Sequence, residues 1–509
     1  MDAFAAIDPD KPVCVTDSGA ALSFGDLDAR SLQLAQFFDL HGLAEGDVLA
    51  ILMENRCDYL VAQWAAHRAG LGYVPVNTRL NPSEIDYILQ DSRARGMVTS
   101  SAMSMQVAQL DYSPVLDVRL SVDGGVEGFD DLYPAISTCP VEPVPGDRAG
   151  HDLVYSSGTT GRPKGILTAI GGDLAAVMRS LYGVDESDVY LSPAPMYHTA
   201  PARTVFAMSQ LGVTTVMMER FDAERFLDLV QRHRVTVTQV VPTMLVRMMK
   251  LDEARRRAYD VSSLRCVLHN AAPCPVAVKQ QVIEWLGPVL YESYAASEGH
   301  GFTYVDSHEW LARPGTVGRA VHGELHICDD DGNELPAGDV GIVYFGGGYE
   351  FEYRNEPGKT AESRHARGWS TVGDVGYVDA EGYLFLTDRK SNMIIIGGVN
   401  VYPQEAENVL VEHSAVMDAA VFGIPHDDLG EEVKAVVELV PTQTPSDALA
   451  AELVEHCRNR LAHVKCPRTI DFTDALPREP NGKLLKRLLR DPFWDRDGAA
   501  GADAHTRRI

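Results

Sequence analysis

The chain has 509 residues, more than a single hydrophobic core usually holds, so we expect at least two domains. Its composition, 45% hydrophobic and 23% charged, is ordinary for a soluble globular protein. The formal net charge of -27 excludes a general affinity for nucleic acid or for an anionic membrane surface.

The first third of the chain alternates the signals of helices and strands. Ser23 with Asp26 resembles a capping pair at the start of a helix. The apolar face of that helix is formed by Leu27, Ser31, Leu34 and Phe38. The alternation continues through residues 48–53, 59–69, 72–76, 211–218, 226–233, 235–241 and 276–286. This rhythm predicts α/β layers with parallel strands.

Near Asp388 the pattern changes to that of a small α+β unit. The expected elements are a helix at 404–413, strands at 417–423 and 433–440, a helix at 447–464 and a strand at 468–472. We therefore predict a large α/β N-terminal domain of layered sheets and helices, residues 1–387, and a small mobile α+β C-terminal domain, residues 388–494. Residues 495–509, rich in Gly, Ala and Asp, are expected to form a disordered tail.

Residues 155–165 concentrate glycine, hydroxyl groups and cations in the order Tyr-Ser-Ser-Gly-Thr-Thr-Gly-Arg-Pro-Lys-Gly. Glycines let a backbone close around a ligand, and hydroxyl and cationic groups donate hydrogen bonds to a polyphosphate. The spacing is not that of a Walker A loop. Composition alone leaves a flexible connector as an equal alternative.

In its order of residues this segment resembles the phosphate loop of the adenylate-forming superfamily, which includes acyl-CoA synthetases, adenylation domains of peptide synthetases and beetle luciferases. The resemblance extends over nearly the whole chain and is greatest to CoA ligases for fatty acids and bile acids. It implies binding of ATP by Ser156, Ser157, Gly158, Thr159, Thr160, Gly161 and Lys164.

Residues 291–299, Tyr-Glu-Ser-Tyr-Ala-Ala-Ser-Glu-Gly, resemble the aromatic-G-x-T-E motif of the same superfamily. The resemblance implies that Tyr294 stacks on adenine, Ser297 touches the α-phosphate and Glu298 holds Mg²⁺. These residue types suit the roles, since an aromatic face binds a purine and a carboxylate binds a hard cation. Without the motif, a lone glutamate in a polar turn is normally just solvated.

Further segments complete the nucleotide site that the resemblance implies. Residues 368–374 resemble the G-W-x-x-T-G-D motif, in which Asp374 accepts hydrogen bonds from the ribose hydroxyls. Residues 388–392 resemble the hinge, with Arg389 contacting the nucleotide and Ser391 standing where relatives have Asp or Lys. The remaining nucleotide-binding residues implied by the resemblance are Asn270, Ala271, Ala272 and Glu292.

Two C-terminal segments extend the resemblance to CoA and to catalysis. Gly397 and Gly398 resemble the glycine loop that lines the pantetheine tunnel. Residues 480–483, Pro-Asn-Gly-Lys, resemble the motif of the catalytic lysine, which makes Lys483 catalytic together with Thr160 and Glu298. By local sequence alone, a lysine in an Asn-Gly turn is usually solvated surface.

The walls of the acid pocket are inferred from segments that face the acyl group in relatives. Ordinary packing is the alternative for each of them. Ala295 is the most informative, because relatives restricted to acetate carry Trp there and a small side chain leaves depth for a larger acid. The predicted pocket residues are His198, Thr199, Gln239, Val240, Ala295 and Ala296.

The resemblance predicts an ATP-dependent acid–CoA ligase that forms an acyl-adenylate and pyrophosphate and then transfers the acyl group to CoA. The substrates would be ATP with Mg²⁺, CoA and a medium-chain, long-chain or bulky acid, including polycyclic acids. Three alternatives stay open: delivery of the acyl group to a carrier protein, oxidation of an adenylate as in luciferases, and a non-catalytic nucleotide-binding protein.

The eight cysteines are scattered and form no CxxC pair, which favours reduced thiols in the cytoplasm over a zinc site or a disulfide framework. The first residues carry no basic segment followed by an apolar run, so we expect no signal peptide. No apolar stretch approaches the ~20 residues that span a bilayer. The sequence leaves open whether the chain forms a homodimer.

Overall fold

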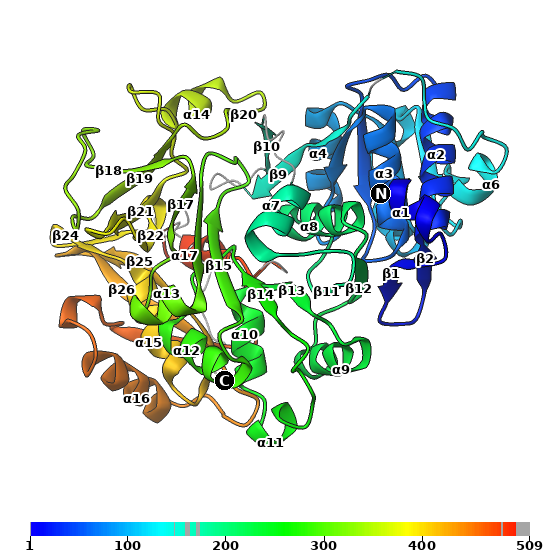
Figure 1. The fold of residues 1–509 in the computed structure, drawn as a ribbon. Coiled ribbons are helices and arrows are strands. Elements are labelled where there is room, and N and C mark those ends of the chain that lie inside the picture. Colours follow the sequence, from blue (N-terminus) through cyan, green and yellow to red (C-terminus); the bar gives the residue numbers. More distant parts are fainter. Residues whose placement is uncertain (1, 147, 158–162, 169–173, 480–481, 495–509) are drawn as a thin grey trace.

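The computed structural model describes residues 2–146, 148–157, 163–168, 174–479 and 482–494, and the strands of these residues form five sheets (Figure 1). A large part with four of the sheets is followed by a smaller part around the fifth, in yellow to red in Figure 1. This arrangement confirms the predicted fold class, a large α/β part with a small α+β part.

The sheet near the N-terminus is parallel throughout, in the order β7-β6-β5-β3-β4-β8. Its strand β3 is buried along its whole length, as expected for a parallel strand covered on both faces. The strands are β3 (Val48–Leu52), β4 (Gly72–Pro75), β5 (Ala94–Thr99), β6 (Val118–Ser121), β7 (Asp130–Asp131) and β8 (His151–Asp152). The helices of this region are α1 (Asp2–Ile7), α2 (Phe24–Leu40), α3 (Asp58–Ala69), α4 (Pro82–Ser92), α5 (Ser104–Val107) and α6 (Leu132–Ile136).

The second large sheet has the order β17-β16-β15-β14-β13-β11-β12-β1-β2 and is parallel from β1 to β15. Antiparallel strands close both edges. The strands are β1 (Pro12–Thr16), β2 (Ala21–Ser23), β11 (Val189–Ser192), β12 (Thr214–Met217), β13 (Val237–Val240), β14 (Cys266–His269), β15 (Leu290–Ala295), β16 (Phe302–Asp306) and β17 (Arg319–His322). The helices are α7 (Leu174–Tyr182), α8 (Thr199–Gln210), α9 (Ala223–His233), α10 (Pro242–Met249), α11 (Glu253–Arg256), α12 (Val276–Leu286) and α13 (Ser307–Ala312).

Two smaller antiparallel sheets complete the large part. One has the order β20-β10-β9, and the other has the order β18-β19-β21-β22. Their strands are β9 (Val154–Ser157), β10 (Pro163–Thr168), β18 (Glu324–Cys328), β19 (Gly341–Gly346), β20 (Phe351–Tyr353), β21 (Asp374–Val378) and β22 (Leu384–Arg389), with helix α14 (Pro357–Glu362).

The small C-terminal part is built on a long antiparallel pair of strands, β25 and β26. On the edge of β26 away from β25, the hairpin of β23 and β24 pairs at Gly430 and β27 pairs parallel with residues 434–438. The elements are β23 (Ile394–Ile396), β24 (Val399–Val401), β25 (Val416–His426), β26 (Gly430–Leu439), β27 (Thr469–Thr473), α15 (Pro403–Glu412), α16 (Asp447–Arg458) and α17 (Lys486–Trp494).

Local signals account for several element boundaries. As predicted, helix α2 follows the cap residue Ser23, whose side chain accepts a hydrogen bond from the backbone N–H of Asp26. The predicted helix at 447–464 is too long: α16 ends at Arg458, and only a 3-10 turn at His463–Lys465 follows. Residues 458–460 are all exposed, so the buried face of the helix is interrupted there.

The two parts of the chain meet along α10. Lys250, at the end of this helix, donates through Nζ to the carbonyl oxygen of His413, just past α15, at 3.3 Å. Sheet membership changes between Arg389, the last residue of β22, and Ile394, the first of β23. The predicted domain limits, 1–387 and 388–494, stay a prediction, and the predicted tail at 495–509 lies outside the described residues.

None of the described helices combines the length and the apolar character needed to cross a membrane.

Candidate active site

The predicted phosphate loop is the connection of a β-hairpin. Ser156 on β9 lies opposite Lys164 on β10, and Ser157 lies opposite Pro163. The connection itself, with the predicted binding residues Gly158, Thr159, Thr160 and Gly161, lies outside the described residues. Burial and the charge of Lys359 lower the pKa of Lys164, and Glu356 and Glu298 oppose this shift. A cation therefore stands beside the hairpin, within electrostatic reach of the carboxylate predicted to hold Mg²⁺.

Glu298, the predicted Mg²⁺ residue, is nearly buried and bonded to a residue that the motifs did not indicate. The hydroxyl of Tyr353 donates to Glu298 Oε1 at 2.9 Å, and the Lys164 ammonium lies 5.5 Å from the centre of the Tyr353 ring. Among the described residues there is no cluster of three or more carboxylate, imidazole or thiol ligands. A single carboxylate fits Mg²⁺, because this ion is usually held by one or two carboxylates together with substrate phosphates and water.

Tyr294, Asp374 and Arg389 come together although they lie on three different strands. The Tyr294 hydroxyl donates to Asp374 Oδ2 at 2.6 Å, and Arg389 Nε donates to Asp374 Oδ1 at 3.0 Å. Burial and the Asp374 charge raise the pKa of Tyr294 well above its ordinary value. The aromatic ring, the carboxylate and the guanidinium predicted for the nucleoside therefore form one hydrogen-bonded group.

The predicted adenine segment follows strand β14. Asn270, Ala271 and Ala272 follow β14 in a loop, and Ala271 has a φ of 72°, in the left-handed region that costs a residue with a Cβ about 1–3 kcal/mol. The carboxylate of Glu292 is buried and accepts a hydrogen bond from Lys279 Nζ at 2.6 Å. Its side chain is thus bonded to an interior lysine, and its role at the nucleotide stays a prediction.

Helix α8 connects two of the predicted walls of the acid pocket. Its first residue, Thr199, places its hydroxyl 3.4 Å from the hydroxyl of Ser297. Five residues further along the helix, the Thr204 hydroxyl donates to Gln239 Oε1, on β13, at 2.9 Å. At the end of β15, Ala295 is exposed and Ala296 is partly exposed, while Val240 is fully buried.

His198, immediately before α8, is held in its neutral form. Burial lowers the pKa of this imidazole to about 3, and the charges of Arg79 and Lys483 add to the effect. A neutral imidazole suits a wall that faces an acyl group, since it places no extra charge beside it.

Asn55 positions the segment that leads to His198, and no motif indicated it. This buried side chain donates to the carbonyl oxygens of Ala194 and Met218 at 3.1 and 2.8 Å and accepts from the Met196 N–H at 2.7 Å. All three partners lie more than 130 positions away in sequence. No local pattern could have identified this residue.

Lys483, from the small C-terminal part, lies among residues of the large part. Burial and the charge of Arg389 lower the pKa of its ammonium, and Glu479, Glu298 and Asp374 act in the opposite direction. The structure therefore brings the predicted catalytic lysine within electrostatic reach of the predicted Mg²⁺ and ribose residues.

The turn that carries Lys483 is fixed by Arg478, which the motifs also missed. Arg478 Nη1 donates to the carbonyl oxygen of Gly482 at 2.6 Å, and Nη2 donates to Asp418 Oδ1 at 2.7 Å. A second anchor follows Lys483, where Lys486 Nζ lies 2.8 Å from Glu407 Oε1. Both anchors join the lysine turn to the sheet and helix of the small part.

The predicted CoA residues lie apart from Lys483. Gly397 and Gly398 form the exposed two-residue turn between β23 and β24, with φ values of 55° and 84° that favour glycine. In Figure 1 this hairpin lies at the left edge, whereas α17, which begins three residues after Lys483, lies further toward the middle. The described arrangement thus presents the lysine turn, and not the glycine turn, to the nucleotide residues.

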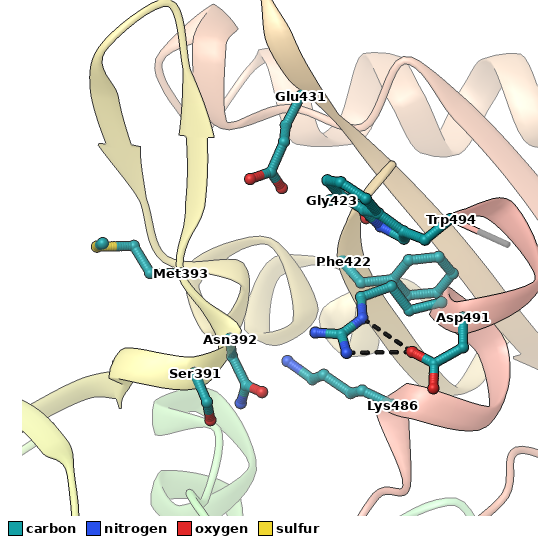
Figure 2. Close-up of a pocket in the computed structure, with 10 residues that line it drawn as sticks. Ser391, Asn392, Met393, Phe422, Gly423, Glu431, Lys486, Asp491 and Trp494 are labelled. Atoms are coloured by element: carbon teal, nitrogen blue, oxygen red, sulfur yellow. Dashed lines mark hydrogen bonds and ion pairs between the residues drawn. The ribbon is translucent and has the colours of Figure 1, made fainter. Parts of the chain in front are cut away.

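Ser391, the predicted pivot, borders a hollow in the small part. It lies in the 3-10 turn Lys390–Asn392 and is exposed. The pocket beside it has a volume of about 450 Å³ (Figure 2). Its two cations are each paired with a carboxylate, Lys486 with Glu407 and Arg490 with Asp491, so no surplus positive charge favours an anionic ligand. The lining residues are Ser391, Asn392, Met393, Phe422, Gly423, Glu431, Lys486, Arg490, Asp491 and Trp494.

Known proteins are similar to this chain over nearly its whole length. Residues 1–351 match the AMP-binding enzyme family, and residues 405–483 match its C-terminal domain. The long-chain-fatty-acid–CoA ligase FadD13 of Mycobacterium tuberculosis is 31% identical, over 93% of both chains.

A second relative and a solved structure extend this likeness. The 3-[(3aS,4S,7aS)-7a-methyl-1,5-dioxo-octahydro-1H-inden-4-yl]propanoyl:CoA ligase of Rhodococcus jostii is 32% identical, over 94% of this chain and 95% of its own. The structure of o-succinylbenzoate CoA synthetase from Bacillus subtilis, with its acyl-adenylate intermediate, has a TM-score of 0.80 at 27% identity, covering 96% of this chain and 97% of that one.

Proposed function

The chain belongs to the AMP-binding enzyme family and is an ATP-dependent, AMP-forming acid–CoA ligase, and from this premise we propose that its acid is medium-chain, long-chain or bulky, including polycyclic acids. ATP and CoA are its co-substrates, and Mg²⁺ is its metal. Support for a large acid comes from Ala295, whose small side chain is exposed at the end of β15. Relatives named for a long-chain fatty acid and for a bicyclic propanoate support the same range.

For the first half-reaction we propose that Lys483 bridges the two reacting groups. The substrate carboxylate bonds to the α-phosphorus of ATP, the bond from that phosphorus to the bridging oxygen breaks, and pyrophosphate leaves. Catalysis is then mostly positioning and stabilisation of charge. The observation that carries this assignment is that the charges of Arg389, Glu298 and Asp374 act on the buried Lys483 ammonium.

The other groups hold the ends of the nucleotide in this proposal. Tyr294, Asp374 and Arg389 bind the nucleoside, Ser297 the α-phosphate, and Thr159, Thr160 and Lys164 the leaving pyrophosphate. Mg²⁺ supplies positive charge to the phosphate oxygens, and Glu298 is the residue that would hold it. The acyl group is lined by His198, Thr199, Gln239, Val240, Ala295 and Ala296.

The second half-reaction requires a different arrangement of the small part. The CoA sulfur bonds to the acyl carbon, the bond from that carbon to the phosphate oxygen breaks, and AMP leaves while the thiol proton is released. The hairpin of β23 and β24, which Gly397 and Gly398 connect, lies away from α17, which follows the lysine turn (Figure 1). We therefore propose that residues 388–494 turn about Ser391 between the two steps, and the hollow beside this residue leaves room for the hinge backbone to move (Figure 2).

We also propose that the protein is located in the cytoplasm. All eight cysteines are free and seven of them are buried, which supports a reducing compartment, the cytoplasm. A homodimer stays a prediction that light scattering on the purified protein tests directly.

The decisive experiment supplies the purified protein with ATP, Mg²⁺, CoA and a panel of acids from acetate through long fatty acids to aromatic and polycyclic acids. Mass spectrometry then reads acyl-AMP and acyl-CoA. We expect acyl-CoA from the larger acids and little from acetate. Acyl-AMP without thioester would instead point to a carrier protein as acceptor, and acetate as the best substrate would refute the proposed acid class.

A further inference from the structure

Gln239 is a polar residue on strand β13, and the residues two positions to either side of it, Val237 and Val241, are apolar. Strand β13 lies within the nine-stranded sheet, and the neighbouring Val237, Val240 and Val241 are all buried. Gln239 itself is only partly buried, so some of its side chain reaches open space. A glutamine at such a place needs a hydrogen-bond partner for each end of its amide, because an unpaired buried polar group costs free energy.

One end of the amide is occupied by α8. The hydroxyl of Thr204, 4% exposed, donates to Gln239 Oε1 at 2.9 Å. No other described residue accepts from this hydroxyl, so the amide oxygen faces α8 and the NH₂ group faces away from it. Within the described ranges, Nε2 makes no hydrogen bond.

The Nε2 end of the Gln239 amide lies near the region where we propose that the acid and Lys483 bind. Two residues further along the chain, Val241 approaches Gly482 of the lysine turn, and a Cβ built on Gly482 would lie 3.1 Å from Val241 Cγ2. Five residues before Thr204, at the start of α8, Thr199 lies beside Ser297. Gln239 therefore lies on a wall between the α-phosphate residue and the lysine turn, with a donor that the protein does not use.

We propose that Gln239 selects acids whose acyl group carries an oxygen acceptor, a carbonyl, hydroxyl or ether oxygen, on the part that lies against β13. This inference rests on the proposed function, since it takes the acid to bind between α8 and β13. An oxygenated acyl group accepts a hydrogen bond from Nε2. A hydrocarbon of the same shape removes water from Nε2 and supplies no partner, so it binds less well.

The test compares acids that differ by one oxygen. The full chain is assayed with 3-cyclohexylpropanoate and its ring-oxo derivatives, and with decanoate and its chain-oxo derivatives, as the ratio of kcat/KM for each oxo acid to that of its parent. Gln239→Met keeps the length of the side chain and removes the donor. Thr204→Val releases the amide from its fixed orientation. Gln280→Met makes the same chemical change at an exposed position on α12.

We expect at least one oxo acid to exceed its parent by about tenfold in the wild type and in Gln280→Met. The ratio should fall to near one in Gln239→Met and to an intermediate value in Thr204→Val. Parent acids used as well as all of their oxo derivatives would overturn the inference, as would a Gln239→Met ratio equal to that of the wild type. A Gln239→Met protein that fails to fold leaves the wild-type and Thr204→Val ratios as the test. Absence of acyl-AMP from every acid of the panel would count against the proposed function instead.

Discussion

At the scale of single residues, removing the charge of Lys483 should slow the first half-reaction much more than the second. Lys483→Ala should slow formation of acyl-AMP by roughly 10²–10³-fold, the usual loss on deleting one preorganised donor. Thioester formation from preformed acyl-AMP should change much less, because the small part is expected to have turned away. Pyrophosphate exchange measures the first step, and release of AMP from synthetic acyl-AMP with CoA measures the second. Equal losses in both would contradict the proposed alternation.

The pH dependence of the first step follows from the same residue. Burial and Arg389 lower the pKa of Lys483 below the ordinary value for lysine. The protonated form, which carries the catalytic charge, is fully present below this pKa and is lost as the pH rises through it. We therefore expect kcat/KM for ATP, which reports the free enzyme, to fall on the alkaline side at a lower pH than an ordinary lysine would give. Lys483→Arg stays charged, so its alkaline decline should move to higher pH. A decline at the same pH in both proteins would assign it to another group.

At the scale of elements, the lysine turn depends on Arg478 for its conformation. This side chain bonds Asp418 on β25 and the carbonyl oxygen of Gly482 at once, a geometry that suits the fork of a guanidinium. Arg478→Met should lower kcat of adenylation by roughly tenfold with a smaller change in KM for ATP, because ATP binds mainly to the large part. Arg478→Lys should recover only part of the rate. The control is Arg460→Met, a similar loss of charge at an exposed position of the small part. A loss of thermal stability with unchanged kcat would leave Arg478 a purely structural residue.

How far the sequence predicts these elements depends on how local their causes are. The cap at Ser23 and the buried run of β3 act within a few residues, and both predictions are confirmed. The site residues could be predicted from motifs because each motif is a contiguous segment. Tyr353 was missed because its partner Glu298 lies 55 positions away, and Arg478 lies 60 positions from Asp418. Such pairs are set by the topology of the sheets, which no single segment encodes.

At the scale of the whole molecule, the described arrangement depends on a close approach of the two parts at Gly482. This residue has a φ of 83°, and a Cβ built on it would lie 3.0 Å from Thr243 Oγ1 and 3.1 Å from Val241 Cγ2. Thr243 and Val241 belong to the large part, at the start of α10. Only a glycine therefore lets the lysine turn approach this wall without displacing it.

Gly482→Asn should accordingly oppose the adenylation arrangement more than the thioester arrangement. Asparagine tolerates a positive φ better than other residues with a Cβ, so the substitution tests the close approach with less backbone strain. Overpacking of this kind costs about 1–3 kcal/mol, which predicts that acyl-AMP formation slows by roughly 5- to 160-fold. Thioester formation from preformed acyl-AMP should be nearly unchanged, since the turn no longer faces Val241 and Thr243 in that step. Gly482→Ala adds only the Cβ at the same contact and should also slow the first step. If both substitutions slow both steps equally, the contact at Gly482 is not specific to one arrangement, and the two parts need not move between the half-reactions.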